Sequence, residues 1–297
     1  MLFAVHISDG VLGWPWLVGG FILAALMLLL ATMRLREEEV PRIAILTAAF
    51  FVSSLIHIRV GPTSMHLLLT GLVGVLLGLR APLAIFVGLV LQAVLIGHGG
   101  YYSLGVNACA MTAPALLCWM LFQALHYAPC VKTPIGRALL VGCGALLLFM
   151  SGVYSLTLVL NTSLTSRDPS VIYLANARLL DPWIAGGGLL FAILAVAVER
   201  QLENTPEFPF GFVIGEISVL LTVALNCVVL LAGGDEELES MLLLGLVVAH
   251  LPIAVVEGVI LGFAVGFLAK VKPEMLGVAK TALNHGEGKA AKACTHN

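Results

Sequence analysis

Long runs of apolar residues are the feature that most constrains the fold of this chain. A run of about 17 or more apolar residues is long enough to cross roughly 30 Å of hydrocarbon as a helix, and a helix satisfies its own backbone groups there. We therefore expect an all-α, polytopic integral membrane helix bundle. Nine nearly uncharged runs occur, at about 11–33, 43–58, 66–79, 83–97, 106–127, 138–160, 183–199, 212–232 and 241–269.

The composition agrees with a membrane protein and excludes nucleic acid as a partner. Hydrophobic residues make up 60% of the chain and charged residues 11%, which is more apolar surface than a soluble domain covers with polar groups. The net charge is −2, and the Lys and Arg residues are dispersed, whereas phosphate binding needs a basic face. The partner that the composition indicates is the lipid bilayer, and we expect a multi-pass protein of the cell inner membrane.

The third run, with about 14 residues, is too short for an ordinary span. It follows the turn-forming "GPTS" of residues 61–64, so we interpret it as a short helix or as half of a helix that begins at membrane depth. Thr63 or Ser64 is expected to cap a helix that starts near Met65. His66 would then lie in the first turn, where the helix dipole favours the neutral ring that a metal requires.

The distribution of Lys and Arg predicts an N-out, C-in orientation. If each run crosses once, one side holds twelve of the fifteen basic residues and the other holds only Arg59, Arg167 and Arg178. The side with the excess is expected to be cytoplasmic.

Polar side chains then gather on the outer side. Taken alone, each histidine there is most simply an interfacial residue bonded to water. In the stretch "GHGGYYSLGVN", residues 97–107, four glycines permit close backbone approach. The group on the outer side comprises His6, Asp9, His57, His66, His98 and Asn107.

A second polar pair lies inside the last apolar run. His250 and Glu257 are seven residues apart, hence on one helix face, with Pro252 between them as an expected kink. A carboxylate in an apolar run usually faces protein or a water-filled cavity. We interpret the pair as a contact to a polar neighbour, such as a partner subunit or a gating element, in preference to a metal site.

Motifs of several enzyme classes are absent from the sequence. It contains no H-E-x-x-H, no G-x-x-x-x-G-K-[ST] and no G-x-S-x-G. The protein is therefore not expected to be an enzyme, and any use of ATP must come from other chains.

Four stretches together resemble one family. "HISDGVLG", "VGPTSMHLLLTGLVGVLLG", "LQAVLIGHGGYYSLGVNACAM" and "AHLPIAVVEGVILGFAVGFLAKVKPEML" are similar to the membrane-embedded substrate-binding (S) subunit of energy-coupling-factor (ECF) transporters for cobalt or nickel, the CbiM/NikM family. The resemblance covers residues 5–127 and 240–276.

The resemblance implies about seven transmembrane helices. Residues 165–235 hold two more apolar runs, which we interpret as an inserted helical hairpin, giving about nine spans. We expect residues 1–276 to form one transmembrane metal-binding domain and residues 277–297 to form a polar cytoplasmic tail.

The resemblance also implies the metal ligands. Family members open Met-His, and the terminal amine, the histidine amide nitrogen and its imidazole join a second histidine from the G-P-T-S-x-H loop. Carried over by motif, these histidines are His6 and His66, with Asp9 orienting the loop. An all-nitrogen, near-square-planar set suits Ni²⁺ and low-spin Co²⁺ and excludes Mg²⁺ and Ca²⁺.

This chain departs from the family at its start, because five residues precede His6. One valine codon, GTG, also starts translation in bacteria, so we expect Val5 to be the true initiator. In the alternative, the five residues are genuine and a third group, such as His57 or His98, completes the site. Asn107 is a further residue that could support or replace a ligand.

These expectations define a transport component. The resemblance implies capture of Co²⁺ or Ni²⁺ at the outer face as cargo, with no permanently bound cofactor. It also implies ATPase subunits, a coupling transmembrane subunit and a small accessory membrane subunit as partners. The alternative is a self-sufficient secondary transporter or channel, for which broken helices and an intramembrane Glu257 are equally natural.

Overall fold

The computed structural model describes residues 6–56, 58–60, 63–128, 133–162, 181–202, 207–233 and 239–277, and it confirms an all-α bundle. The main helices are α1 (Trp14–Thr32), α2 (Val40–Ser53), α3 (Thr70–Leu77), α4 (Ala81–Ile96), α5 (Leu104–Tyr127), α6 (Pro134–Thr162), α8 (Pro182–Leu202), α9 (Phe208–Gly233) and α10 (Glu239–Val271). Short 3₁₀ turns are η1 (Glu37–Glu39), η2 (Gly78–Arg80) and η4 (Pro273–Leu276). Two short strands, β1 (Ile58–Val60) and β2 (Thr63–Met65), pair antiparallel.

Each of the nine apolar runs contains a helix, but the number of spans differs from the expected nine. Among the described residues, seven stretches are long and apolar enough to cross a membrane, and one of them, Thr70–Ile96, joins α3 and α4. The run at 43–58 yields only the 14 residues of α2. Its end is marked by Ser53 and Ser54, whose hydroxyls donate to carbonyls of the preceding turn and so compete with helical bonding.

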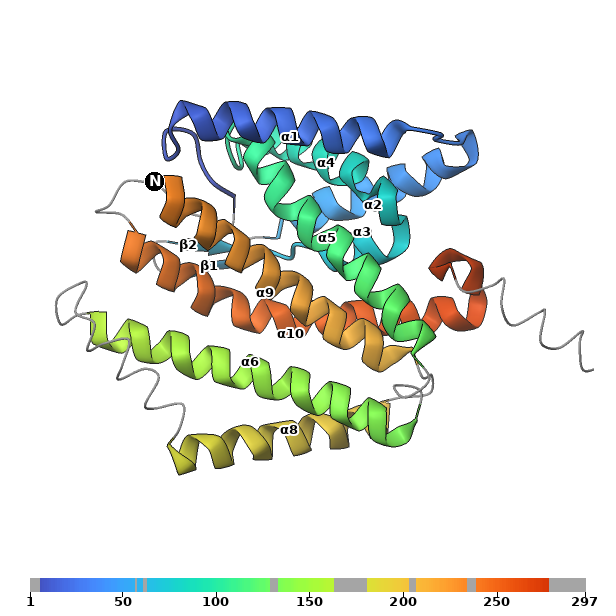
Figure 1. Ribbon diagram of the computed structural model, residues 1–297, viewed down its shortest axis with the longest axis vertical. Helices are drawn as coiled ribbons and strands as arrows, with labels where there is room; N and C mark the ends of the chain where they lie inside the picture. The colour runs from blue at the N-terminus through green and yellow to red at the C-terminus, as the bar shows by residue number, and fades with distance from the viewer. Residues whose placement is uncertain are drawn as a thin grey trace, which may run out of the picture.

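The long helices lie side by side, so their connections gather at two ends of the bundle (Figure 1). One end, the histidine end, holds the residues before α1, the β1–β2 hairpin and the α4–α5 loop. The opposite end holds η1, η2 and η4. At this opposite end the chain reverses between α3 and α4, at Gly78, which has a φ of 53°.

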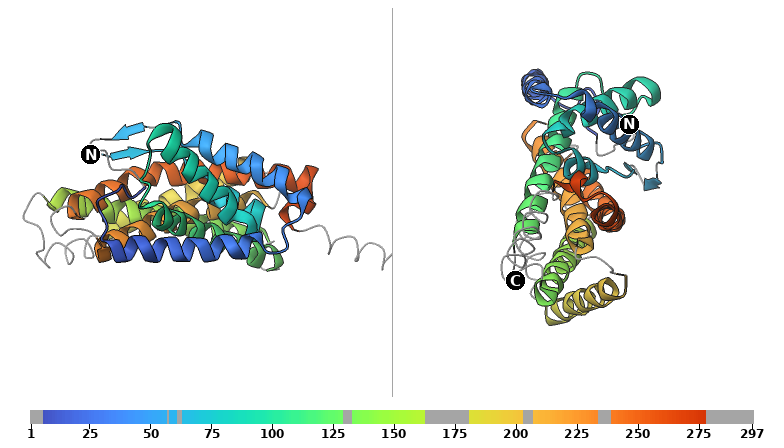
Figure 2. Two further views of the ribbon diagram at one scale, coloured as in Figure 1. Left: turned by 90° about the horizontal axis from the view of Figure 1, so that it is seen from above. Right: turned by 90° about the vertical axis from the view of Figure 1, so that its right-hand side faces the viewer.

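The two helices of the expected inserted hairpin occupy different places. In Figure 1 and in the right-hand view of Figure 2, α8 lies at one edge of the bundle beside α6, and α1 lies at the other edge. By contrast, α9 lies in the middle, where it packs against α5 and α10. That residues 165–235 form an inserted unit stays a prediction. The second helix of this segment, α9, packs inside the bundle and contributes to its apolar core.

Glycines bring the backbones of α9 and α10 into direct contact. A Cβ atom on Gly215 would lie 2.7 Å from the Glu257 carbonyl oxygen and 2.7 Å from the Cα of Gly258. Four residues earlier, a Cβ on Gly211 would lie 2.8 Å from the Cα of Gly262. Small residues at this spacing let helix backbones touch, which is how membrane helices gain van der Waals packing.

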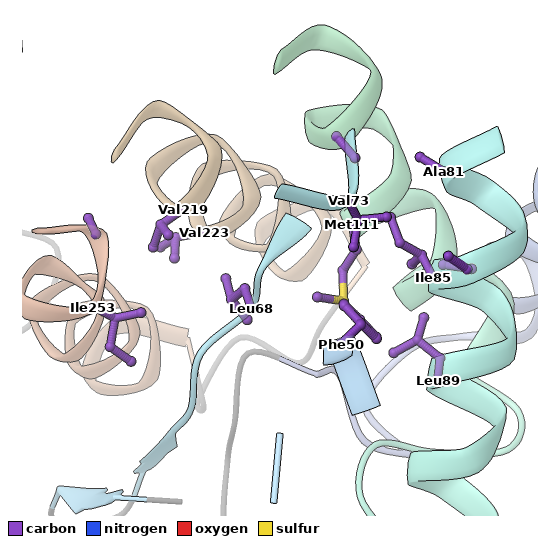
Figure 3. Packing of buried hydrophobic residues seen from close by; sticks show 14 of the residues in the cluster. Phe50, Leu68, Val73, Ala81, Ile85, Leu89, Met111, Val219, Val223 and Ile253 are labelled. Atoms are coloured by element: carbon purple, nitrogen blue, oxygen red, sulfur yellow. The ribbon is translucent and has the colours of Figure 1, made fainter. Parts of the chain in front are cut away.

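The largest apolar core lies between α2, α4, α5, α9 and α10 (Figure 3). Phe50, Ile85, Met111 and Val219 are each at most 1% exposed there. Leu68, which lies two residues after His66 outside any helix, is also fully buried in this cluster. Burying a leucine side chain contributes about 1.5–3 kcal/mol, so Leu68 anchors the segment that carries His66.

Candidate metal site

Three histidines from distant parts of the chain meet at the histidine end. His6 precedes α1, His66 lies between β2 and α3, and His98 lies in the α4–α5 loop. Their ring centroids are 5.1 Å (His6 to His66), 4.9 Å (His6 to His98) and 5.1 Å (His66 to His98) apart. One ring nitrogen from each lies within 4.8 Å of the others. We call this group the histidine triad.

The triad has the chemistry of a transition-metal site. Two imidazole nitrogens that share one ion at about 2.0–2.1 Å are at most roughly 4 Å apart, so small ring rotations bring the three nitrogens into range. Within the described residues, the triad contains no carboxylate. Nitrogen ligands suit Co²⁺, Ni²⁺, Cu²⁺ and Zn²⁺ in preference to Mg²⁺ and Ca²⁺.

The backbone next to His6 is fixed on α5 by Asn107 and Ser103. The Ile7 N–H donates to Asn107 Oδ1 at 2.8 Å, and Asn107 Nδ2 donates back to the Ile7 carbonyl at 2.9 Å. Ser103 Oγ donates to the same carbonyl at 2.6 Å. These bonds satisfy both the N–H and the carbonyl group of Ile7. The position of His6 therefore depends on the residues at the start of α5.

The loop that carries His98 is held by Asp9. Its carboxylate accepts the backbone N–H groups of Tyr101, Tyr102 and Ser103 at 2.8–2.9 Å. A Cβ atom on Gly100 would lie 2.1 Å from Asp9 Oδ1, so only glycine permits this approach. Asp9 therefore ties the amino-terminal loop to the α4–α5 loop and brings two of the three histidines together.

The surroundings of His66 differ from the predicted first turn of a helix. The segment 63–65 is strand β2 and α3 begins only at Thr70, so the helix dipole does not act on His66 as expected. Instead His66 Nδ1 lies 2.9 Å from the Leu67 carbonyl oxygen. Because a carbonyl only accepts, this contact places the hydrogen on Nδ1 and leaves the lone pair on Nε2, which is the tautomer that would present Nε2 to a metal.

Glu257 and His250 lie apart from the triad. The Glu257 carboxylate accepts the backbone N–H groups of Leu68 and Leu69, so its polar neighbour is the chain's own His66 segment. His250 is fully buried, and its Nδ1 lies 2.7 Å from the Leu246 carbonyl in the preceding helical turn. A role for either residue in contacting a partner subunit stays a prediction.

Not every candidate ligand is visible, and one supporting residue was missed. Val5 and His57 lie outside the described residues. Of the others, His6, His66 and His98 come together, with Asp9 and Asn107 bonded directly around them. Ser103 was not anticipated, although its position four residues before Asn107 on one helix face was a usable signal.

Sequence comparison decides the family. A family model described as "Cobalt uptake substrate-specific transmembrane region", CbiM, matches residues 6–180 and 182–275. The chain belongs to the CbiM family. The CbiM match spans all three histidines of the triad as well as Glu257.

Relatives of this CbiM-family chain are named as transport proteins. It is 38% identical over 152 residues to a putative metal transport protein of Haemophilus influenzae, covering 51% of this chain and 72% of the relative. It is 26% identical over 283 residues to the putative cobalt transport protein CbiM 1 of Methanocorpusculum labreanum, covering 92% of each. A putative fused cobalt transport protein CbiMQ of the same organism is 30% identical over 131 residues, 41% of this chain and 22% of the relative. The chain is thus a membrane transport protein of a cobalt-uptake family and not an enzyme.

Proposed function

We propose that this chain is the substrate-specific component of an ATP-dependent ECF transporter and that it captures Co²⁺ or Ni²⁺ with His6, His66 and His98. The observation that carries the proposal is the triad itself, an all-imidazole cluster at one end of an apolar bundle. The family description supports cobalt as cargo. Nickel is retained beside cobalt because both ions accept imidazole nitrogen.

The histidine end is proposed to face the outside. Arg34, Arg36 and Arg80 lie around η1 and η2 at the opposite end, and Arg59 lies at the histidine end. Such an asymmetry supports placing the Arg-rich end in the cytoplasm. The triad would then meet metal before it enters the cell.

Labelling of single cysteines tests this orientation. In whole cells, a membrane-impermeant maleimide is expected to modify a cysteine placed at Tyr102, which is 71% exposed at the histidine end. A cysteine placed at Glu38 in η1 is expected to react only after the cells are opened. The reverse pattern would contradict capture from outside.

Separate subunits are proposed to supply energy and coupling. The sequence carries no nucleotide-binding motif of the G-x-x-x-x-G-K-[ST] type. The fused CbiMQ relative joins a CbiM segment to further transport sequence in one chain, which supports a coupling membrane subunit as a partner here. ATPase subunits complete the proposed assembly.

Uptake into proteoliposomes tests the transport proposal. Vesicles with the chain, a coupling subunit and ATPase subunits are expected to accumulate radioactive Co²⁺ or Ni²⁺ only with ATP. Vesicles with the chain alone are expected to bind metal without accumulating it. A matched preparation with a catalytically inactive ATPase controls for leakage. Accumulation by the chain alone would favour the alternative, a secondary transporter or channel.

A further inference from the structure

The triad is assembled from two structural groups that are held in different ways. His6 and His98 are fixed together because Asp9 in the amino-terminal loop bonds to the α4–α5 loop, and because Ser103 and Asn107 at the start of α5 bond to Ile7. His66 has no part in those bonds. Its segment is attached to α2, α9 and α10, so the site lies where these two groups meet.

Glu257 attaches the His66 segment to α10. It is 3% exposed, and one of its oxygens, Oε1, accepts both the Leu68 and the Leu69 N–H, the latter at 2.9 Å. A buried carboxylate is tolerated only where such donors satisfy it. The two N–H groups are also left without helical partners, because α3 begins after them. Donors and acceptor therefore depend on each other.

The backbone at this attachment is in an unusual conformation. Leu69 has a φ of 50°, one of two non-glycine residues with a positive φ among the described residues. A bulky side chain rarely adopts this region, and it persists only where neighbouring contacts enforce it. Thr70 Oγ1 and Ser218 Oγ on α9 lie 2.7 Å apart and form a second hydrogen bond beside it. The α9–α10 pair thus enforces the turn between His66 and α3.

We propose that Glu257 is a positioning residue that holds His66 in the metal site and makes the site depend on the position of α10. While Glu257 engages both N–H groups, His66 stays beside His6 and His98. Displacement of α10 relative to α5 withdraws His66 from the other two histidines, and the ion loses a ligand. This inference rests on the proposed capture of metal by the triad.

The bond pattern gives a sharp test with three substitutions. Glu257→Gln keeps an Oε1 that accepts both N–H groups, so it is expected to bind Ni²⁺ within about threefold of the parent. Glu257→Asp keeps the charge but withdraws the oxygen by one methylene, and Glu257→Ala removes it. Both are expected to weaken Ni²⁺ binding about 10- to 100-fold, the range for loss of a group that orients a ligand. The matched control is Glu216→Gln, because Glu216 is another buried glutamate of the α9–α10 pair.

The measurements are titration calorimetry of the purified full chain with Ni²⁺ and the electronic absorption spectrum of the Ni²⁺ complex. The spectrum is expected to change in Glu257→Asp and Glu257→Ala and to stay as in the parent in Glu257→Gln and Glu216→Gln. If Glu257→Ala fails to fold, Glu257→Asp decides the matter.

Outcomes separate the two proposals. Parent-like affinity and spectrum in a folded Glu257→Asp would overturn the positioning role, as would a loss in Glu257→Gln as large as in Glu257→Asp. If the parent binds Ni²⁺ through His66 while Glu257→Asp is unchanged, only the positioning role fails. A parent chain that binds neither Ni²⁺ nor Co²⁺ would overturn the metal-capture proposal and the positioning role with it.

Discussion

Replacing His66 with alanine is expected to weaken binding of Ni²⁺ and Co²⁺ by well over tenfold. The side chain is 2% exposed and its ring lies about equally far from His6 and His98, so it supplies one of the three imidazoles of the triad. Loss of a residue that merely supports a ligand already costs about 10–100-fold, and loss of a ligand is expected to cost at least as much. Glutamine is not expected to restore binding, because its amide lacks the imidazole lone pair.

Isothermal titration of the parent and the variant measures this effect. His126→Ala is the matched control, because His126 is also buried but lies about 28 Å along α5 from Asn107, at the opposite end of the bundle. Binding of both metals by His66→Ala within threefold of the parent would show that His66 is not a ligand. A similar loss in His126→Ala would point to a general effect on folding.

Substituting Asp9 with asparagine is expected to weaken metal binding about 10- to 100-fold even though the three histidines of the triad are still present. Both carboxylate oxygens accept backbone N–H groups, Oδ2 from Tyr101 and Oδ1 from Tyr102 and Ser103. An asparagine presents one NH₂ group in place of an acceptor, so one side of the contact becomes donor against donor. The α4–α5 loop is then no longer closed onto the amino-terminal loop, and His98 loses its fixed distance from His6.

The matched control for Asp9 is Asp181→Asn. Asp181 accepts the Trp183 N–H at 2.9 Å at the start of α8, which is a comparable bond remote from the triad. Co²⁺ titration followed by visible absorption reports both affinity and ligand geometry. Equal affinities for Asp9→Asn and the parent would mean that the loop holds its shape without this carboxylate.

Much of the fold and part of the site could be predicted because the determining signals are local. The apolar runs have the length of membrane helices, and each one contains a helix. The glycines at 97–100 predicted a tight loop, and Gly97 and Gly99 do adopt positive φ values. His6, His66 and His98 were candidates by residue type and by side of the membrane.

The rest depended on contacts between residues distant in sequence. Leu67 to Leu69 are as apolar as any helical residue, so nothing local shows that they form an extended segment. Its conformation is set by Glu257, nearly 190 residues further along the chain, and by burial of Leu68. Likewise, α2 stops at Ser53 although apolar residues continue to Ile56, because two serine hydroxyls divert the backbone carbonyls.

The glycine contact between α9 and α10 has a mechanical consequence. With backbones in direct contact at Gly215 and Gly258 and with Phe208 of α9 packed against Phe263 of α10, a displacement of one helix is expected to carry the other with it, so the two helices behave as one stiff rod. From Glu257 to the end of α10 at Val271 this rod extends about 21 Å. There it continues into η4, where Arg42 and Gln123 donate to the Met275 and Leu276 carbonyls. A force applied at that end of the bundle is therefore transmitted along the rod to the residue that holds His66.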